Sequence, residues 1–149
     1  MNDLSAEDTD ALKALITRSN LDGVQFHEIY AKINDDIPDG IAREDADVEL
    51  HYQTRTSDSD FGVRVTVNVT SDSGNARVVV AAEYSLESGG APEPTLLDLF
   101  ASEVAIMTLF PFVREGIQSA TSRVFGVPLL LPVLERGQIR SNTSAKGTD

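Results

Sequence analysis

The sequence predicts an α+β fold in which a four-stranded antiparallel sheet packs against helices. Four strand-like runs follow one another between residues 24 and 86, with polar turns and no helical segment between them. Consecutive strands joined in this way form an antiparallel sheet. A long apolar helical segment then begins near Thr95, and a chain of 149 residues fits one domain.

A short helix is expected before the sheet, from Leu4 to Asn20. Ser5 can cap its N-terminus, and the acidic residues of its first turn suit the positive end of the helix dipole. Leu12, Leu15 and Ile16 form a narrow apolar stripe on one side.

The four strands differ in how clearly they alternate. The first is expected from Val24 to Ile33 and the second from Ala46 to Thr56. The third, Phe61 to Thr70, has valine at every second position over most of its length, and the fourth runs from Ala76 to Leu86. A loop with two glycines and two prolines, Glu87 to Pro94, ends the sheet.

The segment from Thr95 to Leu109 is expected to be a helix that is apolar on most of its circumference. One sheet face can cover one side of such a helix, and in so short a chain the other side needs a second subunit. The pattern therefore predicts an oligomer. The expected subunit interface consists of Leu97, Phe100, Val104 and Met107.

An unusual apolar run follows this helix. Pro111 kinks or restarts the helix, which then becomes amphipathic and stops near Gly126. The run from Val127 to Leu134 contains two prolines, which exclude it from a helix interior or a central strand. It must therefore be extended and lie against another part of the protein.

Composition excludes several function classes. The net charge is −12 and the basic residues are scattered, so a nucleic-acid partner is not expected. The chain has no cysteine, its two histidines, His27 and His51, sit in no metal-ligand pattern, and no nucleophile or phosphate-loop motif is present. We predict no enzyme activity, no metal and no cofactor. The polar, acidic start and the lack of a long uninterrupted apolar stretch indicate a cytoplasmic protein with no membrane partner.

One block of sequence resembles a known family. Leu109 to Glu115 reads Leu-Phe-Pro-Phe-Val-Arg-Glu, and it is followed by the proline-containing apolar run with its Leu-Leu-Pro ending. This block is similar to the most recognisable part of SecB-type export chaperones, and the four preceding strands match that family in order. We therefore expect a SecB-like domain at 22–134, after an acidic segment with one short helix at 1–21 and before a disordered polar tail at 135–149.

The resemblance implies a dimer of dimers that holds non-native polypeptides on apolar grooves without ATP. Any single groove residue is expected to be ordinary core or interface, whereas the proline-bounded segment as a unit fits core and client contact equally well. The client-binding residues carried over from the family's groove elements are Val48, Leu50, Tyr52, Met107, Leu109, Val127, Leu129, Leu130, Leu131 and Val133.

The family also presents acidic residues of its sheet to the export ATPase SecA. Only Glu83 has a counterpart here, since Ile33 and Ile37 stand where carboxylates are expected. This departure, together with the extra N-terminal helix and a missing C-terminal one, indicates a divergent member.

The function that follows is a holdase for unfolded polypeptides, serving protein export or one dedicated client, with SecA or an antitoxin as candidate partners. Two alternatives remain open. One is a chaperone that protects the antitoxin of a toxin–antitoxin pair. The other is a dimeric adaptor, not a chaperone, that binds one folded partner.

Overall fold

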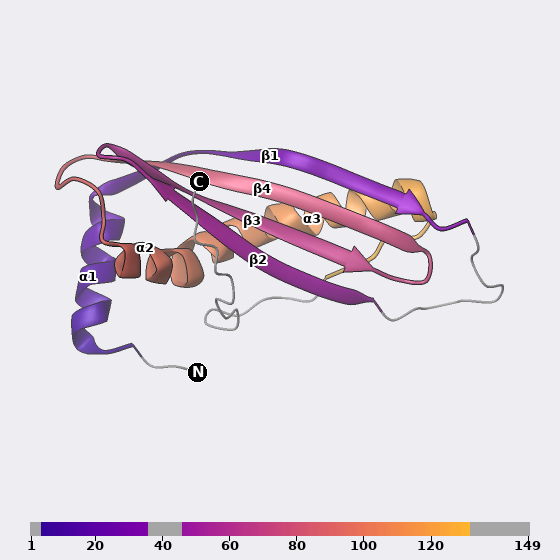
Figure 1. Cartoon of the computed structure of the whole chain (residues 1–149), viewed down its shortest axis with the longest axis horizontal. Coiled ribbons are helices and arrows are strands. Elements are labelled where there is room, and N and C mark those ends of the chain that lie inside the picture. The colour runs from indigo at the N-terminus through magenta and orange to yellow at the C-terminus, as the bar shows by residue number, and fades with distance from the viewer. Residues whose placement is uncertain (1–3, 36–45, 132–149) are drawn as a thin grey trace.

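The computed structural model describes residues 4–35 and 46–131 of the chain. A helix, four strands and a long three-part helix follow one another in sequence (Figure 1). Their bounds are α1 (Ala6–Thr17), β1 (Ser19–Ile33), β2 (Asp47–Thr56), β3 (Asp60–Thr70), β4 (Gly74–Leu86), α2 (Pro94–Phe100), the π-helical segment η1 (Ala101–Ala105) and α3 (Ile106–Phe125).

The strands form one antiparallel sheet in the order β1-β4-β3-β2, which confirms the predicted fold class. Strand β1 begins at Ser19, earlier than predicted, because the residues directly after α1 already pair with the end of β4. Its register shifts between Leu21 and Gly23 and again between Phe26 and Glu28. These irregularities are the reason why β1 lacks clean alternation in the sequence.

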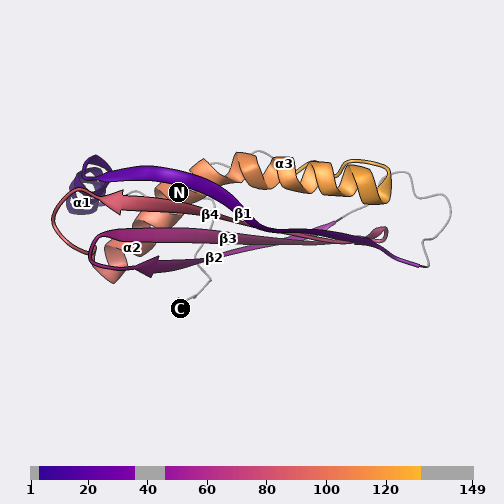
Figure 2. The same cartoon turned by 90° about the horizontal axis from the view of Figure 1, so that it is seen from above.

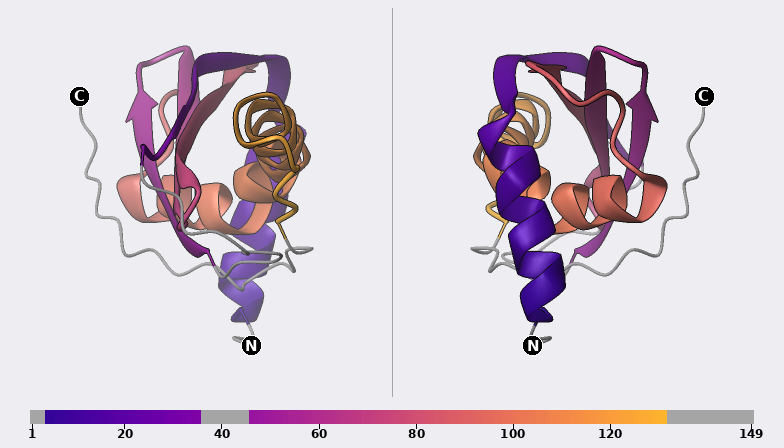
Figure 3. Two further views of the ribbon diagram at one scale, coloured as in Figure 1. Left: turned by 90° about the vertical axis from the view of Figure 1, so that its right-hand side faces the viewer. Right: turned by 90° about the vertical axis from the view of Figure 1, so that its left-hand side faces the viewer.

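The helices cover one face of the sheet and leave the other open (Figures 2 and 3). Helix α3 lies over β4 and β1. Gly116 makes this contact close, because a Cβ atom at this position would lie 3.1 Å from Phe26 Cε1 and 3.2 Å from Val78 Cγ2. The core between the layers is aliphatic, with the alternating valines of β3 and β4 almost completely buried.

The long helix is covered more completely by its own chain than the sequence indicated. Leu97 and Phe100 are 3% and 2% exposed within the single chain, which corrects their assignment to a subunit interface. Leu12 and Leu15 of α1 pack into the same core, so a helix from this chain supplies part of the missing cover. Val104 and Met107 are half-buried, and their role in an interface stays a prediction.

The helix from Pro94 to Phe125 is long and apolar enough to cross a membrane by length and composition alone. Core helices of soluble proteins pass the same test, and 44% of the apolar stretch of this helix is buried inside the structure. It also continues through Pro111, where the sequence suggested a kink or a restart.

Candidate functional site

The chain after α3 folds back along that helix in an extended form. Gly126 ends the helix with φ 84°, a left-handed conformation that favours glycine. The Leu129 N–H then donates to Thr121 Oγ1 at 2.8 Å, and Arg114 Nε donates to the Leu131 carbonyl at 3.2 Å. We call residues 126–131 the return segment. Over residues 127–131 its course along α3 agrees with the prediction that the proline-containing run lies against another part of the protein, while residues 132–134 of that run lie outside the described residues.

Side chains of the return segment alternate between the core and the surface. Leu131 is 3% exposed and Leu129 is half-buried, so these two hold the segment in place. Val127 and Leu130 are 65% and 63% exposed, the largest values among the well-exposed large apolar side chains of the described residues. The segment therefore presents an apolar surface that its own anchoring prevents from collapsing.

Strand β2 contributes the second group of predicted client contacts. Val48 is 45% exposed and Leu50 is half-buried, so the start of this edge strand offers apolar surface. Tyr52 is 3% exposed, and its hydroxyl donates to Asp98 Oδ1 at 2.5 Å. Tyr52 therefore joins β2 to α2 as part of the core.

The predicted client residues thus divide into exposed and buried groups. Tyr52, Leu109 and Leu131 lie in the core of the subunit, which corrects their prediction as contact residues in this structure. They are buried because their faces of β2, α3 and the return segment point between the layers. Met107 is half-buried, and Val133 lies outside the described residues, as do Ile37 and the tail from residue 135.

Sequence reasoning missed a second exposed apolar surface along β1 and α3. Ile29 and Ile33 are 53% and 41% exposed, and Phe112 is 40% exposed while packing edge-to-face on Phe26, with ring centroids 6.4 Å apart. β1 is an edge strand, and among the described residues no further strand lies beyond it. The sequence shows apolar residues here but not that the strand lies at an edge.

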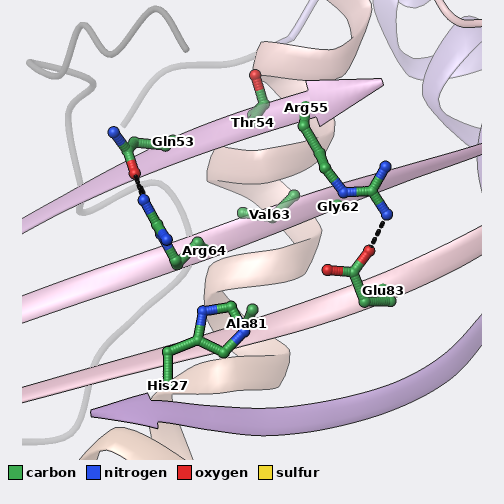
Figure 4. A pocket seen from close by; sticks show the side chains of 9 residues that line it. All are labelled: His27, Gln53, Thr54, Arg55, Gly62, Val63, Arg64, Ala81 and Glu83. Carbon is green, nitrogen blue, oxygen red and sulfur yellow. Dashed lines mark hydrogen bonds and ion pairs between the residues drawn. The ribbon is translucent and has the colours of Figure 1, made fainter. Parts of the chain in front are cut away.

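The open face of the sheet carries Glu83, the residue predicted to dock SecA (Figure 4). Arg55 bridges the Glu83 carboxylate and Asp60, whose Oδ1 lies 2.8 Å from the guanidinium. The hydrogen bond from Arg55 lowers the pKa of Asp60, and the bond to Asp60 is the main cause that raises the pKa of Arg55. Glu83 is thus engaged within its own sheet, and SecA docking stays a prediction.

A shallow hollow of about 230 Å³ lies beside this ion pair. Small residues, Gly62 and Ala81, line it, and Arg64 Nε donates to Gln53 Oε1 at 3.1 Å at its edge. His27 also lines it, without forming a metal-ligand group: none of the described residues gather as three or more His, Asp or Glu that could hold a metal ion.

Comparisons with known proteins find similarity to SecB-like chaperones. No family model matches the sequence. SmegB, a SecB-like chaperone from Mycolicibacterium smegmatis, is 28% identical over 134 residues, which cover 89% of this chain and 87% of that protein. The chain is therefore similar to a SecB-like chaperone over most of its length.

A solved structure shares the SecB-like fold. The SecB-like chaperone of Mycobacterium tuberculosis, in complex with a ChAD peptide from the HigA1 antitoxin, superposes with a TM-score of 0.76 at 20% identity. The match covers 85% of this chain and 98% of that one. Both of these similar proteins are described as SecB-like chaperones.

Proposed function

We propose that this SecB-like protein is a holdase that binds non-native polypeptide segments on the return segment and the start of β2. The supporting observation is the exposure of Val48, Val127 and Leu130, at 45%, 65% and 63%, in a chain of net charge −12. High like charge keeps a protein soluble while it exposes such surface.

The physics of the surface suits extended clients of varied sequence. Covering apolar area is worth about 25 cal/mol per Å², so a few shallow contacts give useful affinity without specific side-chain pockets. Among the described residues no strand pairs with the outer edge of β2, which suits strand-like pairing with a client. This mode of binding needs no nucleotide and no covalent step.

A dedicated antitoxin client is the second candidate. Its support is the M. tuberculosis neighbour, which holds a peptide from an antitoxin. Competition separates the alternatives: a general holdase releases one unfolded client when another is added in excess, whereas a dedicated chaperone retains its antitoxin. An adaptor for a folded partner would bind neither unfolded client.

The proposal is tested by suppression of aggregation without nucleotide. The double variant Val127→Ser/Leu130→Ser removes two exposed side chains whose coverage by a client is worth about 2 kcal/mol, so its affinity should fall about 30-fold. Ile16→Ser/Leu21→Ser is the matched control, because these side chains are 45% and 48% exposed on other elements. Undiminished light scattering by the aggregating client in the presence of the wild-type protein would contradict the proposal. Equal losses of client affinity in the two double variants would also contradict it.

We also propose that β1 and the outer side of α3 form the contact between subunits. Ile29, Ile33 and Phe112 are apolar, exposed and close to an uncovered strand edge. Ile29→Lys should reduce the solution mass toward that of the 16.1 kDa chain, measured by light scattering. A wild-type protein that already has the mass of one chain would refute this.

A further inference from the structure

A groove with an apolar floor lies between α1 and α2. These two helices lie at the opposite end of the molecule from the C-terminal end of α3 (Figure 1). Its volume is about 680 Å³, within the range of sites that accept small ligands or a few side chains. The apolar part of its lining consists of Ala11, Ala91, Pro92, Leu96 and Leu99.

The floor is the side of α2 that the sheet does not cover. Leu97 and Phe100 point into the core, so Leu96 and Leu99, three residues apart, lie on another side of the helix. Both remain half-buried, because α1 places the small Ala11 opposite them rather than a large side chain. Leu96 and Leu99 belong to the apolar circumference predicted for this helix, but not to the four residues predicted for a subunit interface.

The rim of the groove is acidic. Glu7 and Asp8 come from α1, and Glu93 and Asp98 come from α2 and its N-cap. None of these four carboxylates forms an ion pair with another of the described residues.

The single cation of the lining, Arg18, donates to the carbonyls of Ser88 and Gly90 at 2.5 and 2.9 Å. It therefore fixes the loop before α2, and the groove keeps an excess of negative charge. Helix dipoles favour acidic residues near helix N-termini, but they do not explain why apolar side chains lie between these acidic residues.

We propose that this groove docks a segment of a partner polypeptide that carries basic side chains on both sides of one or two aliphatic residues. The aliphatic side chains would cover Leu96 and Leu99, and the basic ones would reach the rim carboxylates. Charge complementarity and the net charge of −12 both favour such a partner and speed its approach. The site is separate from the return segment, so it does not depend on holdase activity.

Binding of two fluorescein-labelled twelve-residue peptides tests the proposal. The peptides share their leucines and differ only in having lysine or glutamate at the flanking positions, and anisotropy is measured with the full chain. The lysine peptide should bind and the glutamate peptide should not. Glu7→Gln/Glu93→Gln should weaken the lysine peptide about fivefold, the combined worth of two exposed charge pairs. Leu96→Ser should weaken it further.

The matched control is Glu49→Gln/Asp58→Asn, which removes the same charge from exposed positions outside the groove. Equal weakening by the two double variants would mean nonspecific attraction and would overturn the proposal. Absence of binding by the lysine peptide would also overturn the proposal. Tighter binding of a synthetic peptide of residues 135–149 would overturn it as well, because the tail of this chain would then be the occupant. A change of oligomer mass in Glu7→Gln/Glu93→Gln would make the occupant a second copy and would equally refute a partner segment. Because aggregation suppression is measured separately, failure here leaves the holdase proposal standing, and the reverse also holds.

Discussion

Thr121 is the residue whose replacement most directly tests how the return segment is held. Its side chain is fully buried; Oγ1 donates to the Ile117 carbonyl at 2.7 Å and accepts the Leu129 N–H at 2.8 Å. Thr121→Val keeps the shape of the side chain and removes both hydrogen bonds. Of the two bonds of Thr121, only the one to Leu129 joins the return segment to α3, so the substitution should act mainly on that segment.

The expected effect is local release of the segment rather than unfolding of the protein. One intramolecular hydrogen bond is worth about 1 kcal/mol, so the population of released segment should rise about fivefold. The buried Leu131 side chain and the Arg114 bond still favour the docked state. The free energy of unfolding should fall by no more than about 1 kcal/mol, because a released amide is hydrated again.

Limited proteolysis with thermolysin, with cleavage mapped by mass spectrometry, measures this population. Cleavage of a transiently opened segment follows the open population when opening and closing are fast. Thr108→Val is the control, since the Thr108 hydroxyl bonds the Val104 carbonyl of its own helical stretch at 3.2 Å and holds no part of the return segment. An unchanged cleavage rate between residues 127 and 131 in Thr121→Val, or an equal rise in the control, would refute the reasoning.

Two further predictions concern packing and pH. Gly116→Val should destabilise the protein by about 1–3 kcal/mol in urea unfolding, because even a Cβ atom would lie 3.1 Å from Phe26 Cε1. Gln118→Val, at an exposed position of α3, should cost much less. Equal losses of stability in the two variants would contradict crowding at Gly116, since valine has a higher helix propensity than glycine. Burial raises the pKa of Tyr84, with the Thr108 hydroxyl opposing the shift. The folded state therefore retains the phenolic proton longer than the unfolded state, and stability falls as pH rises through the unfolded value of about 10. Tyr84→Phe should lack this part of the loss, so its urea midpoint should gain on the wild type between pH 8 and 10.5; a constant difference would show that the hydroxyl does not titrate with unfolding.

The strand and helix pattern was predictable because each element carries its own local signal. Alternating valines in β3 and the proline-interrupted run after α3 allow few other conformations. The start of β1 was misplaced because its pairing with β4, and not its composition, extends the strand back to Ser19. The client-binding residues were harder to predict. Alternation shows which residues share one face of a strand, but not which other element covers that face.

The sequence by itself determined the fold class, the order of the strands along the chain and the extended course of the Pro-bounded run. It did so because periodicity and proline act on neighbouring residues. Only the tertiary structure decided that Leu97, Phe100 and Tyr52 are core, that Val127 and Leu130 face outward, and that α1 and α2 leave an acidic-rimmed groove between them. These outcomes depend on which distant segments meet, and the exposure of an apolar side chain is set by those neighbours rather than by the residue itself.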